Sequence, residues 1–121
     1  MLDYSIMKPE GILVLKVHTP LSAQDFSALG AAVDAYLSDH PKLHGVLIHA
    51  KTFPGWDSIA GFGAHLDFIR AHYNKVERVA LVTDSHMADV AQSLAKYFSA
   101  AQVRHFAFAE DGTALDWLQS D

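Results

Sequence analysis

Two short stretches of this chain are apolar at every position: residues 46–48 (Val-Leu-Ile) and residues 79–82 (Val-Ala-Leu-Val). A strand that is apolar on both sides has to be covered on both faces, which is typical of the central strands of a parallel sheet. Stretches with helical spacing of apolar residues come before and after them, and alternating strands and helices predict a mostly parallel sheet with right-handed crossovers. The chain is therefore expected to have an α/β fold.

The other expected elements follow from periodicity and from turn residues. Residues 5–7 and 12–17 are short apolar segments on either side of a turn with Pro9 and Gly11, which indicates an antiparallel hairpin. Further strands are expected at residues 45–50, 78–83 and 103–109, the last of them near a sheet edge. Helices are expected after Ser22, over about 58–73, after Asp84 or Ser85, and over 113–118. We predict a single domain, residues 1–121, with about five strands, an N-terminal antiparallel hairpin strand and four helices.

Charge and composition narrow the functional classes. The chain has 14 acidic and 9 basic side chains and a formal charge of -5, which disfavours nucleic acid and purely electrostatic membrane binding. It contains no cysteine, which excludes disulfides, thiol catalysis and cysteine-ligated metals. The N-terminus lacks a signal-peptide pattern, and no apolar stretch reaches the length of a membrane span. We therefore expect a cytoplasmic protein.

The most informative loop is residues 52–58, between the strand at 45–50 and the helix at 58–73. Ligands of open α/β sheets bind at the carboxyl ends of strands, where this loop is expected to lie. Phe53 and Trp56 occupy a turn that contains proline and glycine, and Asp57 and Ser58 are placed to cap the helix. The two aromatic residues fit the wall of an apolar pocket, insertion into a membrane interface, or a hydrophobic staple, and these alternatives stay open.

Phe68 stands apart from the apolar stripe of the helix at 58–73, which consists of Ile59, Phe62, Leu66, Ile69 and Tyr73. At 100° per residue, Phe68 is expected on nearly the opposite side. A subunit contact, a membrane-facing patch and a two-sided position in the fold each explain an aromatic residue there.

The histidines do not indicate a metal site. His65 and His72 share a helix face but lie about 10.5 Å apart at 1.5 Å per residue, too far to bind one ion together. His49 lies near the end of its strand, beside the loop, where it fits a polar contact to a ligand. No nucleophile elbow, phosphate loop or dinucleotide fingerprint occurs, so we expect no catalytic residues and no cofactor.

The order of elements and several motifs resemble one known family. The features are the hairpin, four strand-helix units, Gly55-Trp56 after the second of them, and the closing segments 103–106 (Val-Arg-His-Phe) and 114–118 (Ala-Leu-Asp-Trp-Leu). Together they resemble the SpoIIAA-like family of small bacterial proteins over essentially the whole chain. That family is similar to the STAS domains of anti-anti-sigma factors and, more distantly, to CRAL-TRIO lipid-binding domains. The resemblance implies a SpoIIAA/STAS-like fold and a non-enzymatic domain that binds small or lipid-like ligands and associates with membranes.

STAS domains of the anti-anti-sigma kind carry a phosphorylated serine in an Asp-Ser-Ser-Gly turn at the start of a helix. The similar segment here is residues 57–61, Asp-Ser-Ile-Ala-Gly, in which Ile59 replaces the second serine and the glycine comes later. The resemblance therefore makes Ser58 the phosphorylation candidate. Simple helix capping is the alternative explanation for Ser58.

These observations favour a non-enzymatic cytoplasmic domain that holds a small or lipid-like ligand in an apolar crevice, with peripheral membrane contact or a homodimer as further expectations. The expected ligand-binding residues are Phe53, Trp56, Phe62 and Leu66 on the apolar side, with His49 and Asp57 as polar contacts. Phe68 is the candidate for an interaction surface. The alternative function is a STAS-type protein-interaction switch that is phosphorylated at Ser58.

Overall fold

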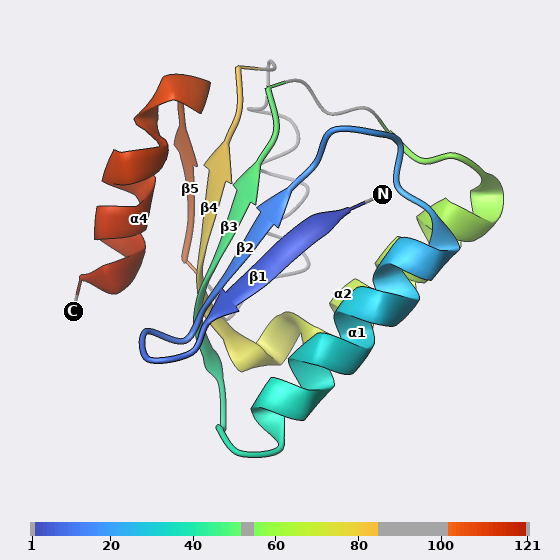
Figure 1. Cartoon of the computed structure of the whole chain (residues 1–121), viewed down its shortest axis with the longest axis horizontal. Coiled ribbons are helices and arrows are strands. Elements are labelled where there is room, and N and C mark those ends of the chain that lie inside the picture. The colour runs from blue at the N-terminus through green and yellow to red at the C-terminus, as the bar shows by residue number, and fades with distance from the viewer. Residues whose placement is uncertain (1, 52–54, 85–101, 121) are drawn as a thin grey trace.

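The computed structural model describes residues 2–51, 55–84 and 102–120 (Figure 1). One mixed sheet runs through this part of the chain in the order β1-β2-β3-β4-β5. Its strands are β1 (Asp3–Met7), β2 (Ile12–Lys16), β3 (Leu43–His49), β4 (Val76–Val82) and β5 (Gln102–Phe106). The β1–β2 hairpin is antiparallel and the other pairs are parallel. The predicted α/β fold with a five-stranded sheet and an N-terminal hairpin is confirmed.

Three α-helices lie in the described ranges: α1 (Ala23–Leu37), α2 (Ile59–His72) and α4 (Asp111–Gln119). The fourth predicted helix, after Asp84 or Ser85, lies outside the described residues. Two short 3₁₀ turns are also present, η1 (Tyr73–Lys75) and η2 (Phe108–Glu110). η2 replaces the end of the strand predicted over 103–109, because the side chain of Glu110 accepts a hydrogen bond from the amide of Ala107 at 2.9 Å and turns the chain there.

The strand order determines which face each helix covers. Each parallel strand from β2 to β4 is added on the same side of the one before it. Right-handed crossovers that step in one direction place their helices on one face of the sheet. Accordingly, α1 and α2 lie side by side on one face and α4 lies on the other (Figure 1).

Alternating side chains of the strands supply both cores. Leu13 and Leu15 of β2 face α1, whereas Ile12 of the same strand belongs to the cluster under α4. In β3, Val46 and Leu47 divide in the same way between the two clusters. Residues that follow each other in a strand point to opposite faces, so a strand covered on both sides is apolar throughout. This explains the two apolar stretches of the sequence.

Helix α1 begins with a capping box. The hydroxyl of Ser22 accepts a hydrogen bond from the amide of Asp25 at 3.1 Å, and the Asp25 carboxylate accepts from the amides of Ser22 and Leu2, each at 3.0 Å. Burial opposes ionisation of Asp25, but these backbone hydrogen bonds outweigh it, and the pKa of Asp25 is lowered from its usual value. The apolar face of α1 is buried through Phe26, Leu29, Val33 and Tyr36. The cap also ties the start of the chain to the helix, through Leu2.

Helix α2 follows the sequence prediction only in part. Ile69 of the predicted stripe is buried, yet Ile59 is 90% exposed and Phe62 is 42% exposed. The other buried positions of α2 are Gly61 and His72. The start of the helix is therefore rotated away from the predicted orientation.

Close contact at Gly61 fixes this rotation at the start of the helix. A Cβ atom on Gly61 would lie 2.7 Å from the carbonyl oxygen of Leu21 and 2.9 Å from the carboxylate of Asp57. Only a residue without a side chain allows the helix to approach the backbone at Leu21 this closely.

Gly61→Ala and Gly63→Ala form a matched pair two residues apart in α2. Gly61→Ala should lower the free energy of unfolding by about 1–3 kcal/mol, because the new methyl group meets backbone that cannot move easily. Gly63 has open space around it, so Gly63→Ala should raise the free energy of unfolding by up to about 1 kcal/mol through helix propensity. Denaturant titration measures both. Equal effects of the two substitutions would contradict the close contact at Gly61.

Candidate functional site

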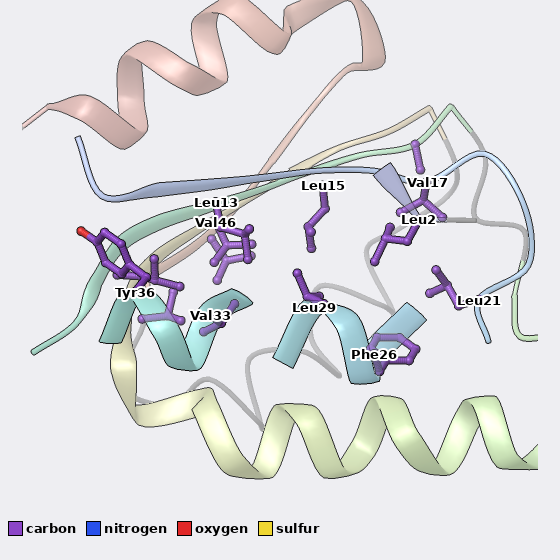
Figure 2. Close-up of a cluster of buried hydrophobic side chains, with 14 residues drawn as sticks. Leu2, Leu13, Leu15, Val17, Leu21, Phe26, Leu29, Val33, Tyr36 and Val46 are labelled. Atoms are coloured by element: carbon purple, nitrogen blue, oxygen red, sulfur yellow. The ribbon is translucent and has the colours of Figure 1, made fainter. Parts of the chain in front are cut away.

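A cavity of about 480 Å³ lies between the sheet and helices α1 and α2. Figure 2 shows side chains of the sheet, among them Leu13 and Leu15, extending toward Leu29 and Val33 of α1. Strands β3 and β4 also contribute to the wall, and α2 closes it from the other side. The described lining is apolar except for the side chains of Trp56, His65, His72 and Thr83. An apolar cavity with few polar groups is typical of small-molecule binding sites.

The turn before α2 forms one rim of the cavity. Trp56 pairs with Leu21 in an isolated parallel bridge, in which the amide of Leu21 donates to the carbonyl of Gly55 and the amide of Asp57 donates to the carbonyl of Leu21, both at 2.9 Å. Gly55 has a φ of 81°, in the left-handed region that favours glycine. The indole ring of Trp56 meets Phe62 edge to face, with ring centroids 4.7 Å apart. Both rings line the cavity and are also partly exposed, so they form a rim between the cavity and solvent.

His65 is held in one protonation state by its neighbours. The indole Nε1 of Trp56 donates a hydrogen bond to Nδ1 of His65 at 3.0 Å. An indole nitrogen only donates, so Nδ1 of His65 carries no hydrogen and the ring proton is on Nε2. The imidazole also stacks on Phe26, with ring centroids 4.7 Å apart. Burial lowers the pKa of His65 to about 4, which agrees with a neutral ring.

His72 joins the two helices at the other end of the cavity wall. Its Nδ1 lies 2.7 Å from the carbonyl oxygen of Phe68, and its Nε2 lies 2.8 Å from a carboxylate oxygen of Asp34 in α1. Both neighbours offer oxygen atoms, so both ring nitrogens of His72 are engaged within the protein. The pair holds α2 against α1.

The structure brings three of the six predicted ligand-binding residues together. Trp56, Phe62 and Leu66 line the cavity, and Phe53 lies outside the described residues. His49 stacks on Phe108 instead, with ring centroids 4.2 Å apart, because it alternates in the strand with Leu47, which faces the side of α4.

Asp57 and Ser58 lie outside the cavity wall. The Ser58 hydroxyl donates to the exposed carboxylate of Asp57 at 2.9 Å and accepts from the amide of Gly61 at 3.1 Å. Ser58 thus has the hydrogen bond of a helix cap. Binding of a ligand by Asp57 and phosphorylation of Ser58 stay predictions.

Phe68 is half buried between α1 and α2, not exposed. It packs against the first core cluster, its ring centroid lies 6.1 Å from that of Phe26, and it lines the cavity. This corresponds to the two-sided position among the alternatives for Phe68. Contact with a membrane or with a second copy of the chain stays a prediction.

Sequence reasoning missed Phe26 and His65 as residues of the site. Phe26 lies in the helix predicted after Ser22 but is not among the predicted site residues, and His65 is considered only as one of two histidines too far apart for a metal. The spacing of Gly61, His65, Phe68 and His72 is a helical stripe and was the available signal. It is less apolar than the stripe that starts at Ile59, so hydrophobicity alone favoured the other one.

Metal-binding clusters and membrane-spanning helices are both absent from the described ranges. In residues 2–51, 55–84 and 102–120, no group of three His, Asp or Glu side chains is placed to bind a metal ion. No helix within those ranges is long and apolar enough to span a membrane.

Burial of His65 makes stability depend on pH. The pKa of His65 is about 4 in the folded protein and 6.5 in the reference state, so the unfolded chain binds more protons between these values. The free energy of unfolding should therefore fall as the pH is lowered from about 6.5 to about 4, by up to about 3 kcal/mol.

Denaturant titrations of wild type and His65→Phe across that range test this expectation. His65→Phe should flatten the pH dependence because it removes the buried imidazole. Parallel curves for wild type and His65→Phe would rule out the assigned burial effect.

Comparisons with known proteins agree with this architecture. The model of the SpoIIAA-like family matches residues 12–119. Among solved structures, an uncharacterised protein of the DUF3478 family from Shewanella loihica PV-4, which has a SpoIIAA-like fold, superposes with a TM-score of 0.73. The two share 19% sequence identity, and the match covers 98% of this chain and 92% of that one. A search of curated proteins gives no match. Because the family model matches nearly the whole chain, this chain belongs to the SpoIIAA-like family.

Proposed function

We propose that this protein is a non-enzymatic binding domain that holds a small apolar or lipid-like molecule between its sheet and helices α1 and α2. The observation that carries the proposal is the cavity of about 480 Å³ with its nearly uniform apolar wall. Its volume falls within the range of about 300–1,000 Å³ that is common for ligand pockets.

The free-energy cost of an empty cavity favours a bound ligand in this space. Protein interiors are close-packed, and an enclosed void destabilises a domain by roughly 24 cal/mol per Å³. On that scale an empty cavity of this size would cost on the order of 10 kcal/mol, as much as the whole free energy of unfolding of a small domain. The value is an upper limit because the rim at Trp56 and Phe62 is partly exposed. A ligand that fills the cavity removes much of this free-energy cost.

The polar side chains of the lining support binding over catalysis. Thr83 donates from its hydroxyl to the carbonyl of Lys51 at 3.2 Å, and Trp56 donates to His65. His72 is engaged by Asp34 and by the carbonyl of Phe68. These hydrogen bonds hold parts of the fold together, whereas a nucleophile or a general base has to present its reactive atom to the substrate.

Two substitutions in α2 test the cavity directly. Leu66→Gln places a polar group in the lining, whereas Ile59→Gln makes the same change at an exposed position outside it. Leu66→Gln should weaken binding of an environment-sensitive apolar fluorescent probe about tenfold or more, because burial of a large apolar side chain contributes about 1.5–3 kcal/mol. Ile59→Gln should leave the affinity of the probe unchanged.

Thermal unfolding of both variants establishes that they remain folded. Native mass spectrometry of freshly purified wild type provides an independent measurement, and it should show an additional bound mass that denaturation removes. Equal probe affinities for wild type and Leu66→Gln, with no bound mass on the wild type, would refute the proposed function.

A second candidate function is the STAS-type switch at Ser58. It is favoured by one observation, the exposure of this serine at the start of α2, next to the Trp56 turn. The capping hydrogen bond to the amide of Gly61 predicts that Ser58→Ala lowers the free energy of unfolding by about 0.5–2 kcal/mol. The intact mass of protein from native cells distinguishes capping alone from a switch. A switch requires a population of molecules that is heavier by one phosphate.

A further inference from the structure

We propose that the cavity selects uncharged apolar molecules that carry one hydrogen-bond acceptor, and that this acceptor binds the Nε2 hydrogen of His65. The inference rests on the proposed function and adds the chemical class of the ligand. It predicts that an apolar molecule with a ketone, ester or amide group binds more tightly than either a pure hydrocarbon or an ionised fatty acid.

The donor is defined by geometry. Because Trp56 donates to Nδ1 of His65 at 3.0 Å, the ring hydrogen is on Nε2. No hydrogen-bond partner of Nε2 occurs in the described part of the chain, and no buried side-chain nitrogen or oxygen there lacks a partner. Nε2 therefore reaches accessible space, and the ring to which it belongs lines the cavity. It is a donor that a bound molecule can use.

The other polar side chains of the described lining are already engaged. The indole hydrogen of Trp56 goes to His65, and both nitrogens of His72 face acceptors. The hydroxyl of Thr83 donates to the carbonyl of Lys51. A ligand with a single acceptor group thus satisfies what the described wall offers, whereas each further polar group would lose its hydrogen bonds to water without replacement.

The charges of the site disfavour an ionised ligand. The described lining contains no lysine or arginine, and His72 is already paired with the carboxylate of Asp34. Burial keeps His65 neutral near pH 7, since its pKa is lowered to about 4. A carboxylate in this cavity would lose its hydration without gaining an unpaired cation, which is unfavourable in an apolar site.

Competition with a fluorescent probe tests the inference with three ten-carbon compounds at pH 7.5: decane, 2-decanone and decanoate. The key quantity is the ratio of the decane dissociation constant to the 2-decanone dissociation constant, compared between wild type and His65→Phe. Dividing the wild-type ratio by the variant ratio cancels the different solubilities of the two compounds in water. One neutral hydrogen bond predicts a wild-type ratio about three- to tenfold larger than that of His65→Phe.

Ile59→Gln serves as the control. It changes α2 at an exposed position outside the cavity lining and keeps the hydrogen bond between Trp56 and His65. Its ratio should stay within about twofold of wild type. A loss of the preference in Ile59→Gln equal to that in His65→Phe would mean that a general change in α2, and not the His65 donor, produces it.

Nitrogen-15 NMR of the histidine rings gives a readout on the wild type that does not depend on variants. In the free protein, His65 should show a protonated Nε2 and an unprotonated Nδ1, and 2-decanone should shift the Nε2 signal whereas decane should not. Equal shifts with both compounds, or tighter binding of decanoate than of 2-decanone, would overturn the inference while leaving the proposed function intact. Failure of all three compounds to displace the probe would count against the proposed function itself.

Discussion

Strands β2, β3 and β4 are parallel and lie in the sheet in the same order as in the chain. Right-handed crossovers between such strands all pass over the same face of the sheet. Both α1 and α2 are therefore on that face, where α2 packs on α1 (Figure 1). The other face receives α4, whose Leu118 packs so closely that a Cβ atom at Gly45 would lie 2.8 Å from it. The two faces thus differ in kind: one is closely packed under a single helix, and the other contains a cavity.

A few polar contacts keep the cavity walls in place. His72 connects α2 to Asp34 of α1, and the turn at Trp56 is paired with the backbone of Leu21 before α1 begins. Close contact at Gly61 sets the rotation of α2 between these two points. Because α2 is held through these contacts with α1 and with the segment before it, it can cover the sheet while its side chains leave a cavity beneath it.

Most of the fold followed from the sequence because strong local patterns decide it. The apolar residues 46–48 and 79–82 have no other stable location than a sheet covered on both faces, and Ser22 with Asp25 specifies the start of α1. The rotation of α2 about its axis could not be predicted from the sequence, because the helix has two stripes with helical spacing and either of them could face the sheet. The choice between them depends on contacts with Leu21 and Asp34, which are distant in sequence.

The site was predictable to a smaller extent. Trp56, Phe62 and Leu66 were placed near a crevice because aromatic and apolar residues next to a strand end indicate one. His49 was predicted to lie there too but stacks on Phe108 on the other face of the sheet, because a strand that is apolar on both faces gives no sign of which face borders a cavity. His65 depends on a hydrogen bond between side chains nine positions apart, which spacing does not reveal.

The position of a bound molecule is the most direct test of the account. Crystals soaked with a brominated apolar compound would locate the bromine by its anomalous scattering. The account predicts one bromine site enclosed by Leu15 of the sheet, Leu29 of α1 and Leu66 of α2. Bromine found only on the outer surface, or on the side of the sheet that α4 covers, would contradict it.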